Sequence, residues 1–294
     1  LLSDAKPVVL SGIQPQRAPH IGNYLGAIRS WVEMQSHYDC YFAAVDLHAL
    51  TVTQDPKELY EGTLEGVAYY LACGLDPQKM TLFIQSHVAA HAELGWILTC
   101  SSYMGELSRM TQYKDKTQKQ AHIGVGLFTY PALMAADILL YQPHFVPIGH
   151  DQKQHLELTR NLAERLNNRY KQQLFKTPEP FITKVAARVM DLQNPLSKMS
   201  KSAKNPKGVV FLDDTDKEIT KKIKSAVTDS GSVVVDYSEA SPGLKNLCET
   251  HGALSGKKPE EVAQEYKGRQ YGYLKVDTAQ LAVSVIAPIR SEAQ

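Results

Sequence analysis

Two lysines and two serines stand within five residues of each other, at Lys198, Ser200, Lys201 and Ser202. A lysine carries a compact positive charge on a long stem, so a pair of lysines on a short loop can follow the charge that develops on a polyphosphate. Neighbouring hydroxyl groups add further polar contacts. These residue types suit phosphoryl chemistry, although composition alone also allows a solvated basic loop.

A second candidate phosphate site lies near the N-terminus, in residues 20–23 (HIGN). The apolar run 7–12 predicts a buried strand that feeds a loop, and an apolar stripe at Leu25, Ile28 and Val32 predicts a helix after it. A helix start that follows a strand and a loop offers free backbone N–H groups to an anion. His20 and Asn23 could donate hydrogen bonds to phosphate oxygens, and Gly22 would let a ligand approach the backbone. Taken alone, the tetrapeptide also allows a loop histidine and an N-capping asparagine.

The elements that must position these groups alternate along the chain. Apolar runs predict further strands at 40–45, 81–86 and 144–149, and helical patterns lie at 55–74, 90–100 and 132–141. This alternation is typical of an α/β fold with a doubly wound parallel sheet. We therefore predict a Rossmann-like catalytic domain at 1–190, a loop and linker at 191–208, and a smaller helical C-terminal domain at 209–294.

Four shorter stretches carry weaker signals. The polar segment 106–120 lacks an apolar stripe and predicts an exposed loop, and 177–180 predicts a turn. Residues 209–212 predict a brief strand. The basic segment 213–228 predicts a helix with Val227 on its apolar side, and its lysines fit either a solvated face or contact with RNA phosphates.

One carboxylate stands inside an apolar helix. Asp137 lies in the run MAADILL, and a buried charge is costly unless it is paired. Its partner is therefore either a structural donor or a ligand, and the sequence leaves both open. His48 follows a predicted strand, where side chains face the ligand crevice of such a sheet, or it is a structural histidine. Asp151 is expected to cap the helix that it opens.

Bulk composition restricts the class of protein. A net charge of +1 over 294 residues excludes a chain coated in basic residues, so any contact with nucleic acid must come from local patches. No apolar run approaches the roughly 18 residues needed to span a membrane. The chain starts at Leu1 without Met, so an organellar location stays open beside a cytoplasmic one. The four cysteines are widely spaced, at Cys40, Cys73, Cys100 and Cys248. This spacing indicates free thiols in an intracellular protein rather than disulfides or a zinc site.

The string 198–202 (KMSKS) resembles the lysine loop of class I aminoacyl-tRNA synthetases, and 20–23 resembles their first signature, in the expected order. The closer resemblance is to the bacterial-type tryptophanyl-tRNA synthetases, and it covers essentially the whole chain. It is carried by 11–15 (SGIQP), 21–27 (IGNYLGA), 45–46 (VD), 106–112 (ELSRMTQ), 134–138 (MAADI), 151–155 (DQKQH) and 222–229 (KIKSAVTD).

The resemblance implies an amino-acid site. Asp137 would accept the indole N–H of tryptophan, and because the carboxylate would be left unpaired by phenylalanine, it would discriminate strongly. An apolar slot around the ring would be formed by Met134, Ile138, Val146 and Ile148. The ammonium and carboxylate of the amino acid would lie near Gln14, His48, Tyr130 and Gln152.

The resemblance also implies an ATP site. His20, Gly22 and Asn23 would hold phosphates, and Val189 and Met199 would lie near the adenine. Further ATP contacts would come from Gln14, Gly149, Asp151, Gln152, Lys198, Ser200 and Lys201. The leaving pyrophosphate would be stabilised by Lys116, Lys198 and Lys201, with Mg²⁺ bound through the phosphates and not by protein ligands.

The reaction implied is in-line attack of the tryptophan carboxylate on the α-phosphorus, which gives Trp-AMP and pyrophosphate. Tryptophan then passes to the 2′-OH of the terminal adenosine of tRNA(Trp). The resemblance further implies a homodimer in the cytoplasm and an anticodon-binding role for 209–294. Family members continue for some tens of residues beyond the point that matches Gln294, so we expect that domain to be incomplete here.

Three departures and three alternatives accompany the resemblance. Residues 16–18 (QRA), Leu47 and His150 differ from the family pattern. A tyrosyl-tRNA synthetase shares the fold but typically has Gln at the position of Met134, and an HxGH-type nucleotidylyltransferase would not need an apolar slot around Asp137. A catalytically silent RNA-binding relative would have lost the lysines, which are intact here.

Overall fold

The structure, a computed structural model, describes residues 6–15, 17–117, 123–149, 152–181, 189–201, 203 and 205–294, without the side chains of 115–117. The chain divides into two compact units whose segments interleave along the sequence. Unit 1 takes Leu1–Gln16, Glu33–Val67 and Asp76–Lys184, and unit 2 takes Arg17–Val32, Ala68–Leu75 and Val185–Gln294. The functional domains predicted as continuous ranges stay a prediction.

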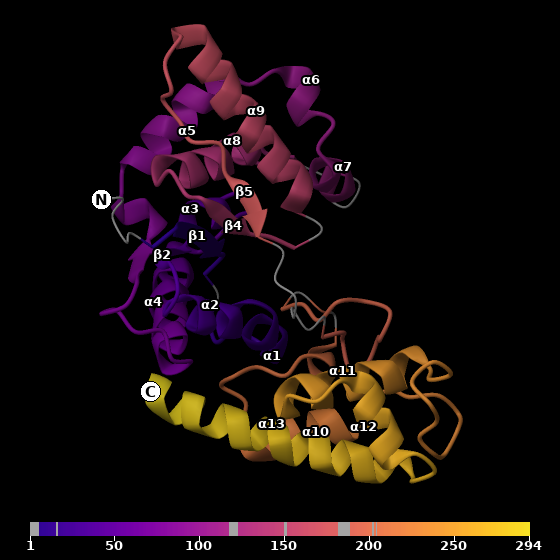
Figure 1. Ribbon diagram of the computed structural model, residues 1–294. Coiled ribbons are helices and arrows are strands. Elements are labelled where there is room, and N and C mark those ends of the chain that lie inside the picture. Colours follow the sequence, from indigo (N-terminus) through magenta and orange to yellow (C-terminus); the bar gives the residue numbers. More distant parts are fainter. Residues whose placement is uncertain are drawn as a thin grey trace. The chain divides into compact units, whose positions relative to one another are not determined.

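Unit 1 is built on a five-stranded parallel sheet with the strand order β3-β2-β1-β4-β5 (Figure 1). Its strands are β1 (Val8–Ile13), β2 (Asp39–Ala44), β3 (Thr81–Ile84), β4 (Phe145–Pro147) and β5 (Glu179–Phe181). In the register, Val9 lies opposite Cys40 on one side and opposite Phe145 on the other. The predicted α/β class with a parallel sheet is confirmed.

The strand β5 corrects the turn predicted at 177–180. Pro180 lies within it, opposite Val146 of β4, and the backbone N–H of Glu179 donates to the carbonyl of His144 at 2.9 Å. A proline is tolerated here because β5 is an edge strand of the sheet. The local pattern contained a proline but not the neighbouring strand that pairs with it.

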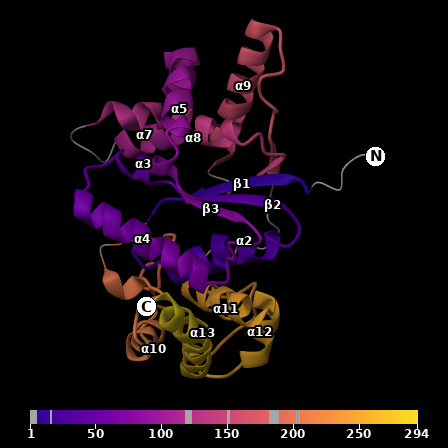
Figure 2. The same ribbon diagram turned by 90° about the vertical axis from the view of Figure 1, so that its left-hand side faces the viewer.

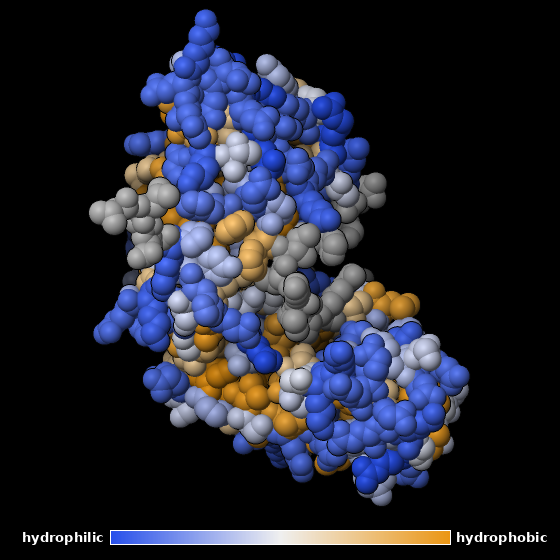
Figure 3. Space-filling model, viewed as in Figure 1, coloured by the Kyte–Doolittle hydropathy of each residue, from blue (hydrophilic) through white to orange (hydrophobic). Residues whose placement is uncertain are grey.

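Helices cover both faces of this sheet. Figure 2 shows α5 (Ala90–Ser101), α8 (Val125–Leu140) and α9 (Lys153–Tyr170) on one side of it, and the 56–67 part of α4 (Pro56–Ala72) on the other. α5 packs closely on α8, since a Cβ at Gly95 would lie 3.1 Å from Cδ1 of Leu133. The outward face of α9 is hydrophilic in Figure 3, as its amphipathic sequence requires.

The segment 106–120, predicted as an exposed loop, contains helical structure. α6 (Met104–Leu107) and α7 (Thr111–Thr117) lie in it or next to it. The Glu106 carboxylate pairs with the Arg165 guanidinium of α9 and accepts from the Tyr103 N–H at 3.1 Å, while Leu107 and Met110 are buried. The loop prediction was wrong because this ion pair joins residues far apart in the sequence.

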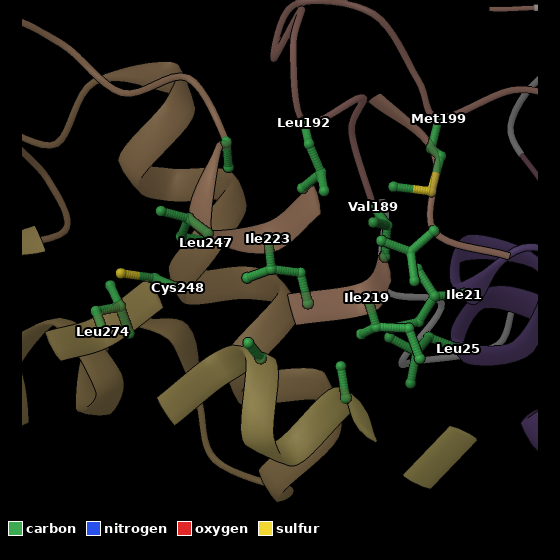
Figure 4. Close-up of a cluster of buried hydrophobic side chains, with 14 of the residues drawn as sticks. Ile21, Leu25, Val189, Leu192, Met199, Ile219, Ile223, Leu247, Cys248 and Leu274 are labelled. Carbon is green, nitrogen blue, oxygen red and sulfur yellow. The ribbon is translucent and has the colours of Figure 1, made fainter. Parts of the chain in front are cut away.

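Unit 2 is mainly helical. It contains α1 (Ile21–Asn23), which continues through a π-helical turn (Tyr24–Ile28) into the 29–32 part of α2 (Arg29–Met34), and then α10 (Asp216–Lys224), α11 (Pro242–Ser255), α12 (Pro259–Tyr266) and α13 (Tyr271–Ala293). Its core joins the first helical segment to the C-terminal helices: Figure 4 shows Ile21 and Leu25 in one cluster with Ile219, Leu247 and Leu274. The smaller helical part of the prediction is confirmed.

Two local predictions in unit 2 were wrong. Residues 209–212 form no strand; instead the Ile21 N–H donates to the Val210 carbonyl and the Leu212 N–H to the Pro19 carbonyl, both at 2.8 Å. The predicted helix 213–228 is shorter, because the Val227 N–H leaves the helical pattern and donates to the Leu192 carbonyl at 2.7 Å. Val227 is consequently exposed.

Within the described residues, no helix is both long and apolar enough to cross a membrane. The thiols of Cys40, Cys73, Cys100 and Cys248 are all free. Cys40 and Cys248 are buried, whereas Cys100 is exposed.

Candidate active site

Asp137 lies on α8 in unit 1, and only 5 % of its surface is exposed. Its two oxygens receive hydrogen bonds from three different elements. Nε2 of His48, on the short helix α3 (Asp46–Ala49) that follows β2, lies 2.6 Å from Oδ2. Nε2 of Gln85, just after β3, lies 2.6 Å from Oδ1, and Nδ1 of His91 on α5 lies 2.7 Å from the same oxygen. The carboxylate predicted to need a partner therefore has protein donors on both sides.

These donors keep the Asp137 carboxyl ionised. Burial by itself would raise its pKa, but the hydrogen bonds from His48 and His91, the electrostatic attraction of His48 and the Gln85 amide hold the pKa below its ordinary value. Because folding lowers this pKa, the pairing stabilises the fold above the ordinary carboxyl pKa. That contribution is lost as the pH falls through the lower folded-state value.

Three residues of this network were missed by the sequence analysis: Gln85, His91 and Tyr141. Gln85 is fully buried and also accepts the Leu47 N–H at 3.0 Å, so it ties the end of β2 to Asp137. It follows a strand as His48 does, and the same rule on the carboxyl ends of parallel strands would have found it. No local signal identifies His91 or Tyr141, because α5 and α8 bring them together.

The four residues predicted to form an apolar slot belong to one hydrophobic cluster, and two of them, Met134 and Ile138, lie on α8 with Asp137. Ile138 and Val146 are buried in it, and Met134 and Ile148 pack against them. Met134 lies one turn before Ile138 on α8, while Val146 belongs to β4. A charged acceptor next to apolar side chains suits a flat ring with one polar N–H.

Polar residues predicted near the amino-acid backbone groups are brought together only in part. The rings of His48 and Tyr130 lie 6.2 Å apart between centroids, and the Tyr130 hydroxyl lies 2.7 Å from Nε2 of His155 and 3.2 Å from Oε1 of Gln112. Gln14 is exposed just after β1. The Gln152 N–H donates to the carbonyl of Gly149 at 3.1 Å, at the start of α9. For Gln14 and Gln152 the roles stay predictions.

In unit 2, His20 and Asn23 cap one another. The Asn23 N–H donates to Nδ1 of His20 at 3.2 Å, and the His20 N–H donates to Oδ1 of Asn23 at 3.1 Å. A Cβ at Gly22 would lie 3.0 Å from the His20 ring, so only glycine leaves the ring in this position without a shift. The Asn23 side-chain amide still has two donors in its Nδ2 group.

Burial, reinforced by the charge of Lys198, lowers the pKa of His20 to about 4. The ring is therefore neutral at physiological pH. Since Nδ1 accepts the Asn23 N–H, the single ring proton lies on Nε2. His20 thus offers one N–H donor without adding a positive charge, which suits a contact to a phosphate oxygen.

The lysine loop is anchored through its methionine. The Met199 N–H donates to the Val189 carbonyl at 3.1 Å, and the Asp191 N–H to the Ser197 carbonyl at 2.9 Å. Met199 is 2 % exposed and lies beside Val189 in the core cluster of unit 2 (Figure 4). Lys198, Ser200 and Lys201 are exposed around it. The buried methionine fixes the loop while the ammonium groups stay in solvent.

Asn246 of α11 holds the segment that leads into this loop. Its Oδ1 accepts the Met190 N–H at 2.9 Å, and its Nδ2 donates to the Met190 carbonyl at 3.0 Å. Within unit 2 the loop is thus tied to a C-terminal helix.

Several predicted site residues lie outside the described part of the chain: Asp151, Ser202 and the side chain of Lys116, together with Gln16 and His150 of the departures from the family pattern. The backbone of Lys116 lies in α7. Of the ATP-binding predictions, Gln14, Gly149 and Gln152 belong to unit 1. His20, Gly22, Asn23, Val189, Lys198, Met199, Ser200 and Lys201 belong to unit 2.

Over residues 3–286, the sequence matches the family described as tRNA synthetases class I (W and Y). The chain belongs to this family. The resemblance read from the lysine loop and the 20–23 signature is therefore confirmed.

Two similar ligases come from bacteria. The tryptophan–tRNA ligase of Caldanaerobacter subterraneus subsp. tengcongensis is 53 % identical over 96 % of this chain and 86 % of its own length. That of Corynebacterium glutamicum is 52 % identical over 97 % of this chain and 83 % of its own.

Among solved structures, tryptophanyl-tRNA synthetase from Mycoplasma pneumoniae superposes with a TM-score of 0.90 at 38 % identity, covering 98 % of this chain and 88 % of its own. The Campylobacter jejuni enzyme, complexed with ADP and tryptophan, gives 0.82 at 34 % identity, covering 97 % and 88 %. The tyrosyl-tRNA synthetase of Archaeoglobus fulgidus, at 19 % identity, shares the fold.

Proposed function

We propose that this chain is a tryptophan–tRNA ligase, which activates L-tryptophan with ATP and transfers it to tRNA(Trp). The observation that carries the proposal is the ionised Asp137 beside the apolar cluster of Met134, Ile138, Val146 and Ile148. This arrangement suits an aromatic ring with one N–H. The names of the bacterial relatives support the same assignment.

Activation needs no side chain as a nucleophile. The tryptophan carboxylate attacks the α-phosphorus of ATP, an oxygen–phosphorus bond forms, and the bond to the leaving pyrophosphate breaks. Asp137 binds the indole N–H, His20 and Asn23 bind phosphate oxygens, and Lys198 and Lys201 neutralise the charge that grows on the pyrophosphate. Positioning and charge stabilisation supply the rate enhancement.

We propose that Mg²⁺ accompanies ATP and is held by the phosphates. Among the described residues, no group of three or more His, Cys, Asp or Glu side chains could hold a metal ion. The exposed donors near the lysine loop are ammonium and hydroxyl groups, which suit phosphate oxygens better than a cation.

The test of this function is amino-acid-dependent exchange between ATP and pyrophosphate. We expect labelled pyrophosphate to enter ATP when L-tryptophan is present, and not with tyrosine or phenylalanine at equal concentration. Exchange supported better by tyrosine would indicate the tyrosyl alternative. Incorporation without any amino acid would point to a nucleotidylyltransferase.

We propose that unit 2 contacts the tRNA through exposed lysines of α10. Lys222 is not available for this role, because its ammonium lies 2.6 Å from the Asp214 carboxylate and 5.3 Å from the centre of the Phe211 ring. Lys217, Lys221 and Lys224 are exposed around the same helix. The anticodon-binding role of 209–294 is a proposal supported by family membership and by these charges.

We also propose that the chain acts as a homodimer through α4 and β3. Tyr60 and Leu64 on α4 are 64 % and 45 % exposed, one helical turn apart, and Val67 follows on the same face. Val67, with Leu82, Phe83, Ile84 and His87, lines a recess of about 340 Å³. β3 is one of the two edge strands of the sheet, so a second copy could cover this apolar surface at that edge.

Leu64→Glu should convert this dimer to a monomer, because a charge would then be buried at the centre of the interface. Sedimentation equilibrium should give twice the chain mass of 32.7 kDa for the unmodified protein, and the single chain mass for the variant. Tyr170→Glu, at an exposed aromatic residue on α9, is the matched control and should stay dimeric. A dimer retained by Leu64→Glu would place the interface elsewhere.

We propose that the enzyme works in the cytoplasm. The free thiols of Cys40, Cys73, Cys100 and Cys248 fit a reducing compartment. The similar ligases are bacterial, so nothing supports the organellar alternative.

A further inference from the structure

His91 is a buried histidine to which neither the sequence motifs nor the proposed reaction gives a role. None of its surface is exposed, and it stands between two polar groups of α8. Its Nδ1 lies 2.7 Å from Oδ1 of Asp137, and its Nε2 lies 2.9 Å from the Tyr141 hydroxyl at the end of the helix. Both ring nitrogens are therefore used.

The contacts leave the Asp137 carboxylate with one open acceptor position. An ionised carboxylate oxygen accepts about two hydrogen bonds. Oδ1 already takes the donors of Gln85 and His91, so it is filled. Among the described residues, only His48 donates to Oδ2, so this oxygen has room for one further donor. The substrate N–H can therefore meet the carboxylate only at Oδ2.

The hydrogen-bond partners assign the tautomer of His91. Nδ1 faces an ionised acceptor and so carries a proton, and in a neutral ring Nε2 must then accept from the Tyr141 hydroxyl. Burial and the nearby Asp137 charge raise the pKa of Tyr141 to about 12, so the hydroxyl keeps the proton that it donates. The Tyr141 ring is held by Tyr41 and Phe83, at 5.1 and 5.2 Å between centroids.

We propose that His91, fixed by Tyr141, is a positioning residue that fills Oδ1 of Asp137, presents Oδ2 to the substrate and so selects a ring bearing an N–H. This inference rests on the proposed function. Without the His91 donor, Gln85 still holds Oδ1 and His48 still holds Oδ2, but each oxygen then has an open position, so the substrate N–H can meet either one. The preference for a substrate N–H at one fixed place should then weaken.

A selectivity ratio separates this role from a merely structural one. The numerator is kcat/KM for L-tryptophan in pyrophosphate exchange, and the denominator is kcat/KM for β-(3-benzothienyl)-alanine. This analogue has the same ring shape with sulfur in place of the N–H. A loosened fold lowers both values together, whereas a misplaced acceptor lowers only the value for tryptophan.

Four variants give the comparison. His91→Leu removes both hydrogen bonds and should lower the ratio roughly tenfold or more relative to the unmodified enzyme. His91→Asn keeps an N–H near the position of Nδ1 and should restore most of the ratio. Tyr141→Phe removes the hydroxyl and should lower the ratio by a few-fold, roughly. Tyr41→Phe is the control, because its ring packs on Tyr141 but its hydroxyl makes none of the Asp137 contacts.

The outcomes decide separately on the two proposals. If the unmodified enzyme shows no exchange with tryptophan, the proposed function fails and this inference fails with it. If that enzyme is active but His91→Leu leaves the ratio unchanged, the positioning role alone is overturned. Should His91→Leu fail to fold, Tyr141→Phe decides: a lowered ratio supports the inference, and a ratio equal to that of Tyr41→Phe overturns it.

Discussion

Asp137→Asn should lower kcat/KM for tryptophan by a factor equivalent to roughly 2–4 kcal/mol, the scale of a buried hydrogen bond to a charged group. The amide keeps the shape of the carboxylate but has a single acceptor oxygen. His48, Gln85 and His91 all point toward this group, so the new NH₂ must face at least one of them or the substrate. The decrease should appear in kcat/KM for tryptophan, whereas the KM for ATP should change little.

Pyrophosphate exchange at varied tryptophan and at varied ATP measures both effects. Asp39→Asn is a suitable control, because Asp39 is an exposed carboxylate at the start of β2. Unchanged discrimination between tryptophan and phenylalanine in the Asp137 variant would show that the carboxylate is only structural. A matching rise in the KM for ATP would instead point to a general disturbance of the fold.

The sequence could predict that Asp137 needs partners but not which ones. A carboxylate among apolar helix residues signals a paired charge, and this much follows from desolvation. The donors come from the ends of β2 and β3 and from α5, more than forty residues away in each case. The order of the strands decides which chain segments meet, and this order cannot be predicted from any local sequence pattern. Protein donors and a ligand were therefore left as alternatives, and the structure leaves room for both on one carboxylate.

Predictions from local pattern succeeded where the pattern reflects local forces. The helix predicted at 55–74 is α4 (Pro56–Ala72), which starts at the cap of Asp55 and ends before Gly74, whose φ of +106° suits glycine. The elements that were missed depend on distant partners: β5 on β4, and α6 on Arg165. The phosphate-site signature at 20–23 was identified from its residue types. The burial that keeps His20 neutral, and the mutual cap with Asn23 that assigns its ring proton, needed coordinates.

Lys198→Ala or Lys201→Ala should lower kcat for Trp-AMP formation roughly 100-fold, the scale for removing one electrostatic stabiliser of a transition state. Both side chains are exposed on either side of the buried Met199, so in the free enzyme their ammonium groups are hydrated. Their interaction with the phosphates is strongest when negative charge builds up on the departing pyrophosphate. In the ground state the charge of ATP does not change, so the lysines contribute less to ATP binding than to the transition state. The KM for ATP should therefore change much less than kcat.

Pre-steady-state formation of Trp-AMP at varied ATP separates the two parameters. Lys207→Ala is the matched control, because Lys207 is an exposed lysine of the same unit just beyond the loop. Met199→Ala should resemble the lysine variants without removing a charge, since it deletes the side chain that anchors the loop in the core cluster. If the lysine variants keep the saturating rate and only half-saturation shifts, the loop clamps ATP in the ground state. A lower kcat in Met199→Ala with an unchanged KM for ATP would show that the charges act only when the loop is held in place, because a lost adenine contact would raise that KM.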